Sequence, residues 1–189
     1  MPITINGSGT VTGISVGGLP DGIVDTDTLA AGAGGVNEVD VWRQTADFTG
    51  DKVPITTGWE RNDSYGFSKL GTGMTESSGV FSFPSTGFWH IQAVFGFQIA
   101  AGTDSTYCNP CIDTTIDNGS TWNFAAEGNS SLADEERYTV APVDYIFDVT
   151  NTTNCKVRFD VWAGDGSLIT RGDTNKNETW VNFIRLGDT

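Results

Sequence analysis

Most nucleophilic and general-base catalysis would depend on a histidine, and this chain has one, His90. A serine or cysteine nucleophile needs such a base within hydrogen-bonding reach, so any catalytic pair would have to form around it. His90 falls inside a run of apolar–polar alternation, which is typical of a strand and favours a structural role. No pair stands out among the 24 Asp and Glu residues, and no glycine-rich phosphate loop precedes a helix. We therefore predict no enzyme activity.

The three cysteines, Cys108, Cys111 and Cys155, form one C-x-x-C motif and one single thiol. A zinc site usually needs a fourth Cys or His at matched spacing, and the one histidine lies on an expected strand. Structural thiols are the favoured interpretation. A disulfide, and a metal or redox site, are the alternatives.

Acidic residues outnumber basic ones by 24 to 10, which gives a net charge of −14. Nucleic-acid binding needs clustered Lys and Arg, so DNA and RNA are excluded as partners. Calcium could bind carboxylate oxygens of acidic loops, and the candidates are Asp104, Asp134–Glu136, Asp165 and Asp173. Their spacing fits no continuous calcium loop. No metal or other cofactor is therefore predicted, with calcium at these loops as the alternative.

Several aromatic residues fall in or beside turns rich in Gly, Asn and Ser. Exposed rings on loops suit sugar stacking or protein contact. The candidates for receptor binding are Tyr65, Tyr107, Trp122 and Tyr138, with Phe124 beside them. The alternative, that these rings close an oligomer or pack under loops, is at least as well supported.

The strands that must position these residues are visible as period-two patterns. The strongest runs over 89–99, where every odd residue is apolar and the even ones include His90, Gln92 and Gln98. Similar alternation covers 143–149 and 155–163. A further strand, from residue 39, places Val39 and Val41 on one face against Asp40 and Trp42.

About eight short strands separated by Gly, Asn and Pro turns predict an all-β antiparallel sandwich, either a jelly roll or an immunoglobulin-like fold. The closing segment, 180–186, is apolar on both faces. Such a strand invites aggregation at a sheet edge, so it should be central or lie at a subunit interface.

The first 36 residues differ from the rest: they contain nine glycines, no aromatic residue and no Lys or Arg. They cannot build a core alone, because their few apolar side chains do not offset the backbone entropy lost on ordering. We expect an extended arm over 1–37 and one folded head over 38–189. No run reaches the roughly 18 apolar residues of a membrane span, so no membrane insertion is predicted.

The head resembles a known superfamily. The order of its segments is similar to that in the trimeric jelly roll of tumour necrosis factor (TNF) and the complement globular head. These segments are Ser77–Trp89, then a long aromatic strand, then Val157–Trp162 and finally Thr179–Gly187. The superfamily element G-x-F-x-x-P-x-x-G-x-Y is matched by Gly79, Phe81, Pro84 and Gly87, with Trp89 in place of Tyr. The resemblance implies a TNF-like antiparallel jelly roll that assembles as a homotrimer. The trimer-interface residues expected from it are Phe95, Phe97, Trp180, Phe183, Ile184 and Leu186.

The N-terminal segment, residues 3–30, is similar to the opening of small fibre-like or appendage proteins of tailed bacteriophages. This resemblance implies a virion structural protein on the exterior of a phage particle. Its arm would dock on other virion proteins, and its head would bind a host cell-surface glycan or protein. The anchoring residues expected are Ile3, Ile5, Val11, Ile14, Leu19, Ile23 and Leu29.

Two other functions stay open. A capsid decoration protein that stabilises the shell as a trimer would use the same fold, since fold does not determine function. It differs from a tail fibre in being present in many more copies per particle. A secreted cytokine-like ligand fits least, because the first 30 residues have no basic region followed by an apolar one.

Overall fold

The computed structural model describes residues 4–5, 11–12, 35–99, 102–133 and 138–189. The chain divides into two compact units, Met1–Gly35 and Val36–Thr189. In the first, β1 (Thr4–Ile5) pairs antiparallel with β2 (Val11–Thr12). Of the predicted anchoring residues, Ile5 and Val11 fall on these two strands. The others lie outside the described residues: Ile3, Ile14, Leu19, Ile23 and Leu29.

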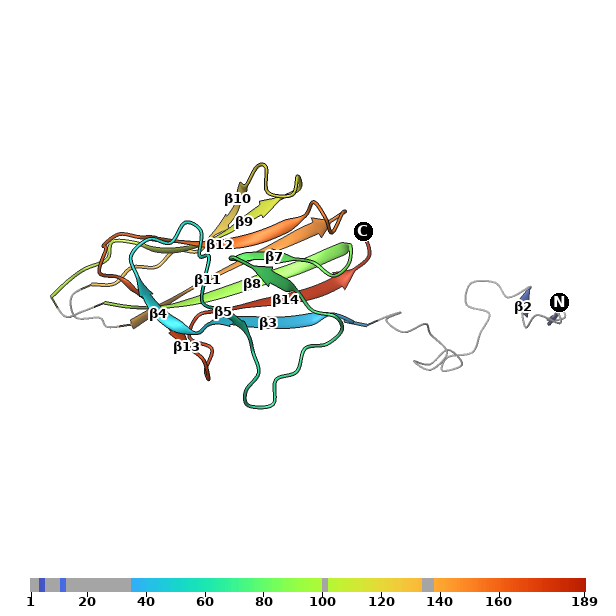
Figure 1. Cartoon of the computed structure of the whole chain (residues 1–189), viewed down its shortest axis with the longest axis horizontal. Coiled ribbons are helices and arrows are strands. Elements are labelled where there is room, and N and C mark those ends of the chain that lie inside the picture. The colour runs from blue at the N-terminus through green and yellow to red at the C-terminus, as the bar shows by residue number, and fades with distance from the viewer. Residues whose placement is uncertain (1–3, 6–10, 13–34, 100–101, 134–137) are drawn as a thin grey trace. The chain divides into compact units, whose positions relative to one another are not determined.

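The second unit, called the head below, is a sandwich of two antiparallel sheets (Figure 1). The seven-stranded sheet contains β3 (Val39–Gln44), β4 (Ala46–Thr49), β5 (Trp59–Arg61), β8 (Gly87–Gln98), β11 (Tyr138–Val149), β13 (Ile169–Asp173) and β14 (Trp180–Gly187). The five-stranded sheet contains β6 (Thr75–Ser77), β7 (Val80–Ser82), β9 (Cys108–Thr115), β10 (Asn123–Glu127) and β12 (Lys156–Ala163). Among the described residues no helix is long and apolar enough to cross a membrane.

The order of strands brings sequence-distant segments together. The seven-stranded sheet runs β4-β13-β8-β14-β3-β5, and β11 also pairs with β8 along its whole length. The five-stranded sheet runs β10-β9-β12-β7-β6. The closing strand β14 therefore lies between β8 and β3, which confirms that it is central in its sheet.

The core lies between the two sheets and is rich in aromatic rings. As predicted, the odd residues of β8 are buried, from Trp89 to Phe97. From the other sheet, Phe81 packs edge-on against Trp42 and Trp59, with ring centroids 5.5 Å apart. It also contacts Phe183 at 5.3 Å. Such edge-to-face pairs add to the stability that comes from burial.

The turn before Phe81 explains the first glycine of the superfamily element. Ser77 pairs with Val80, so Ser78 and Gly79 form a two-residue hairpin loop, with φ of 52° and 82°. Two positive φ angles define a type I′ turn, which favours glycine. A Cβ on Gly79 would also lie 2.0 Å from the carbonyl oxygen of Ile55. Glycine is therefore required here by both backbone conformation and space.

The two chain ends of the head lie at the same end of the sandwich. The amide of Arg185 donates to the carbonyl of Glu38, and Ile184 pairs with Val39. At the opposite end, Tyr138 pairs with Gln98. The described loop residues 102–107 and 128–133 lie there, where Ser130 contacts Thr139 and Ser105 pairs with Leu132. The head thus has one end that carries its chain termini and another that carries loops.

Three of the predicted trimer-interface residues are wrong. Phe95, Phe97 and Phe183 have no exposed surface in the isolated chain, because they occupy the core-facing positions of β8 and β14. Their rings pack inside the head's own core, so they have no surface that a second copy could contact. Trp180, Ile184 and Leu186 occupy the alternate positions of β14 and face away from the core.

Candidate functional site

The seven-stranded sheet has an outward face on the side opposite the core, formed by the even-numbered residues of β8, β11 and β14. The strand register places Val94 between Pro142 and Trp180. The large hydrophobic side chains most exposed on this outward face are Tyr138, Val140, Ile146 and Leu186, followed by Phe88. Exposed apolar side chains gathered on one face of a folded domain are typical of an interaction surface.

Polar side chains interrupt the middle of the outward face. Gln92 lies between Asp144 and Asn182 in the strand register. The Oδ1 atom of Asn182 is buried and has no hydrogen-bond partner among the described residues. Buried polar atoms normally find partners, so this atom has unused capacity to accept a hydrogen bond.

His90 also belongs to the outward face, between Ile146 and Ile184. Its Nε2 atom lies 3.8 Å from Asp144 Oδ2, and its side chain is 29% exposed. The ring therefore lies beside a carboxylate and two aliphatic side chains, on a surface rather than in a cleft.

The C-x-x-C cysteines are separated by the geometry of their strand. Cys108 and Cys111 lie on β9, three residues apart, and side chains at odd spacing point to opposite faces of a sheet. Cys108 packs in the hydrophobic core, whereas Cys111 pairs with Asp160 on the other face. All three cysteines are buried free thiols. The structural interpretation of the thiols fits this arrangement, and a bond within the motif does not.

A buried acidic cluster surrounds Cys111 on the five-stranded sheet. Burial and the nearby Asp113 raise the pKa of Asp160 to about 7. Burial, together with Glu127, Asp160 and Asp113, raises the pKa of the Cys111 thiol to about 12. A thiol with such a pKa stays protonated at neutral pH and is a poor nucleophile.

The acidic loops are organised by local hydrogen bonds. The Asp165 carboxylate accepts from the hydroxyl and the amide of Ser167, and Asp173 accepts from the amides of Asn175 and Lys176. These bonds lower the pKa of both carboxyls. Asp104 lies on a separate loop, and 134–136 lie outside the described residues. The described part of the chain contains no cluster of three or more His, Cys, Asp or Glu suited to a metal ion.

The predicted receptor-binding rings have different surroundings. Trp122 stacks under the Arg158 guanidinium at 4.4 Å, and Tyr138 lies under Arg171 at 4.9 Å. Tyr107 is 42% exposed and borders an open hollow lined by small hydroxyl residues. Tyr65 is 87% exposed. Tyr65 and Tyr107 therefore line different hollows, and Trp122 and Tyr138 each contact an arginine.

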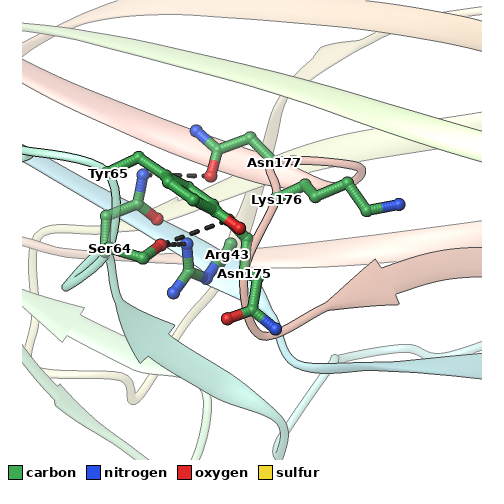
Figure 2. Close-up of a pocket in the computed structure, with 7 residues that line it drawn as sticks. Arg43, Ser64, Tyr65, Asn175, Lys176 and Asn177 are labelled. Carbon is green, nitrogen blue, oxygen red and sulfur yellow. Dashed lines mark hydrogen bonds between the residues drawn. The ribbon is translucent and has the colours of Figure 1, made fainter.

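Tyr65 lines a pocket of about 260 Å³ that joins three parts of the head (Figure 2). Besides Lys176, its walls are Arg43, Asn62, Ser64, Tyr65, Asn175 and Asn177. Arg43 lies on β3. Residues 62, 64 and 65 belong to the loop after β5, and residues 175–177 belong to the turn before β14. We call this the Tyr65 pocket.

The Tyr65 pocket is held together by side-chain hydrogen bonds. The Arg43 Nη1 donates to Ser64 Oγ at 2.9 Å, and Ser64 Oγ in turn donates to the Asn175 carbonyl at 3.2 Å. Asn62 Nδ2 donates to Asn177 Oδ1 at 2.9 Å. Of the residues that line the pocket, the sequence predicts Tyr65 alone. Two signals for the other residues were present: an arginine inside an apolar strand, and the asparagine-rich segment 175–177.

Comparison with solved structures identifies the fold. Murine APRIL at pH 5.0 matches with a TM-score of 0.57 and 9% identity, covering 79% of this chain and 98% of that one. Eiger TNF from S. frugiperda matches with a TM-score of 0.58 and 10% identity, covering 80% and 93%. The predicted TNF-like antiparallel jelly roll is confirmed. At such identities the likeness shows the fold alone. No family model and no curated protein sequence matches the chain.

Proposed function

We propose that this chain is a non-catalytic virion structural protein whose heads assemble as a homotrimer through the outward face of the seven-stranded sheet. The observation that carries the assembly is that face, where Phe88, Ile146 and Leu186 stay exposed in the single chain. Covering it with a second copy would remove this apolar surface from water, which is the main driving force for association. Trp180 and Ile184 lie on the same face.

The virion placement is supported by the resemblance of residues 3–30 to phage appendage arms. In this proposal the arm docks on another virion protein and the loop end of the head meets the host surface. Tail-fibre and decoration functions differ in stoichiometry. Counting copies per purified particle by quantitative mass spectrometry tests the choice: a few trimers support a tail appendage, and many copies would replace it with a decoration function.

Assembly is tested by one substitution on the outward face and one matched control. Ile146→Glu places a carboxylate on a residue that is 56% exposed, and burying that charge at an interface is costly. We expect at least a tenfold weaker assembly by mass photometry. The control, Ile116→Glu, alters a residue that is 64% exposed and outside the seven-stranded sheet, and it should leave the trimer intact. A wild-type monomer at micromolar concentration would contradict the proposal.

A further inference from the structure

We propose that the Tyr65 pocket binds a single neutral sugar ring. The inference deepens the proposed function, on which it rests only for the source of the sugar, a host surface glycan. Four features of the pocket lead to this ligand: a strained exposed tyrosine, hydrogen-bonding amides, paired charges and a small volume.

The tyrosine is held in an unfavourable backbone conformation. Tyr65 has φ of 54°, in the left-handed region that bulky residues rarely occupy. The next residue, Gly66, has φ of 83°, so the loop presents the ring at the tip of a tight turn. Strain of this kind is concentrated at binding and catalytic sites. The exposed ring offers a flat apolar surface on which the C–H face of a sugar can stack.

The amides of the pocket supply both kinds of hydrogen-bonding group. The Nδ2 atom of Asn62 donates a hydrogen bond to Asn177, whereas its Oδ1 atom is buried and has no partner among the described residues. Asn177 uses its Oδ1 in that bond and keeps two N–H donors for a ligand. A sugar hydroxyl both donates and accepts, so neighbouring hydroxyls on one ring can satisfy the Asn62 acceptor and the Asn177 donors.

The charges of the pocket favour a neutral ligand. The Arg43 guanidinium donates to Glu60 at 2.7 Å and to Asp63 at 2.8 Å. Lys176 pairs with Glu178 at 3.1 Å and Asp173 at 3.5 Å. Each cation that lines the pocket therefore already faces two carboxylates. Glu178 also pairs with Arg171 at 2.7 Å, so the group contains four carboxylates and three cations. An acidic sugar or a phosphate would add a further negative charge to a group that is already net negative.

The size of the pocket limits the ligand to about one ring. Its volume of about 260 Å³ is just below the roughly 300 Å³ at which pockets begin to accept drug-sized molecules. A ligand with about a dozen non-hydrogen atoms and a few hydrogen bonds binds with a dissociation constant on the order of 1 mM.

Ligand-observed saturation-transfer NMR on the full chain tests the proposal. The probes are methyl α-D-glucopyranoside, methyl β-D-galactopyranoside and N-acetyl-D-glucosamine, with D-glucuronic acid and N-acetylneuraminic acid as acidic comparisons. At least one neutral probe should receive saturation from the wild type, and the acidic probes should receive less. The absence of a signal from every neutral probe, or a stronger signal from an acidic one, overturns the proposal.

Two variants at one position separate binding from folding. Tyr65→Gly relieves the positive φ, so the head should stay folded with an unchanged or higher Tm, while the signal falls at least tenfold. Tyr65→Phe retains the ring and should retain most of the signal. Tyr107→Ala, in the other hollow, is the control and should change nothing. A full signal from Tyr65→Gly rules out this pocket.

The same samples distinguish failure of the pocket from failure of the assembly. Mass photometry reports the trimer without any sugar present, whereas saturation transfer needs no trimer. A trimer that gives no signal overturns the pocket alone. A monomer that gives a signal lost in Tyr65→Gly supports the pocket and overturns the assembly.

Discussion

At the scale of single residues, Asp160 is a carboxyl whose folded environment disfavours its charge. It is 2% exposed, and one of its oxygens has no hydrogen-bond partner in the described part of the chain. The neighbouring Asp113 is committed to Arg158, with 2.8 Å between Oδ2 and Nη2. Protonation of Asp160 therefore avoids a second buried negative charge beside Asp113.

The raised pKa of Asp160 predicts how stability depends on pH. Between pH 3.8 and about pH 7 the folded protein keeps a proton on Asp160 that the unfolded chain has lost. The stability that comes from this proton is therefore complete below pH 3.8 and is lost as the pH rises toward about 7. Asn imitates the protonated carboxyl at every pH. As the pH rises across that window, the unfolding free energy of Asp160→Asn should increase relative to that of the wild type by at most about 1.4 kcal/mol per pH unit.

Urea unfolding between about pH 4 and about pH 8 measures this difference. Asp165→Asn is the comparison of opposite sign, because hydrogen bonds from Ser167 lower the pKa of Asp165. Removing that carboxylate should reduce stability at neutral pH, and the deficit should shrink as pH falls. Parallel pH profiles for Asp160→Asn and the wild type would contradict the assignment.

The sequence predicts that the cysteines are structural but cannot predict the acid beside Cys111. The contact between Cys111 and Asp160 depends on the register of β9 against β12, which joins residues 49 positions apart. The Tyr65 pocket has the same origin, because its walls come from three separate segments. A single exposed aromatic in a turn is visible in sequence, whereas the side chains that complete its pocket are not.

At the scale of elements, Asp40 joins β3 to its neighbours from inside the fold. Its carboxylate accepts hydrogen bonds from Trp42 Nε1, Arg61 and the Met74 amide. Arg61 lies on β5, and Met74 precedes β6 in the other sheet. One buried carboxylate thus ties an edge strand and the connection between the two sheets to β3.

Removing this carboxylate should be strongly destabilising. Asp40→Ala leaves the Trp42 indole N–H and the Met74 amide without their acceptor and removes the carboxylate partner of Arg61, and breaking a buried ion pair typically costs about 3 to 5 kcal/mol. Asp188→Ala removes an ion pair with Arg185 whose acid is 91% exposed, and it should cost less than about 1 kcal/mol. Equilibrium denaturation by guanidinium measures both, and equal effects would refute the central role of Asp40.

The sequence predicts the long strands well because their alternation is strict, as in β8 and β12. It is misleading where a polar residue faces inward. Val39 and Val41 form the more apolar face of β3 in sequence, yet Asp40 and Trp42 are the buried pair. The long-range ion pair with Arg61 makes burial of Asp40 acceptable. The wrong interface residues, Phe95, Phe97 and Phe183, have a different cause: alternation identifies an apolar face but does not show whether a sheet of the same chain or a second copy covers it.

At the scale of the whole molecule, the head builds a large core. Among the residues that the structure describes, its hydrophobic core extends from Trp42 to Phe183. Deleting residues 1–35 should therefore leave the head folded, with its thermal unfolding transition unchanged by circular dichroism. If the arm is the virion anchor, the same deletion should abolish incorporation into particles, as detected by immunoblotting. Retained incorporation would show that the head itself docks.

The position of the head's chain termini at one end of the sandwich has a practical consequence for display. A biotin group attached after Thr189 would tether the head by the end where Glu38 meets Arg185. The Tyr65 pocket, which lies beside the start of β14, would then have the same position relative to the tether in every head. An array of heads immobilised in this way presents its pockets in one common direction, as a glycan-capture sensor requires. Attachment through surface lysines would orient them at random.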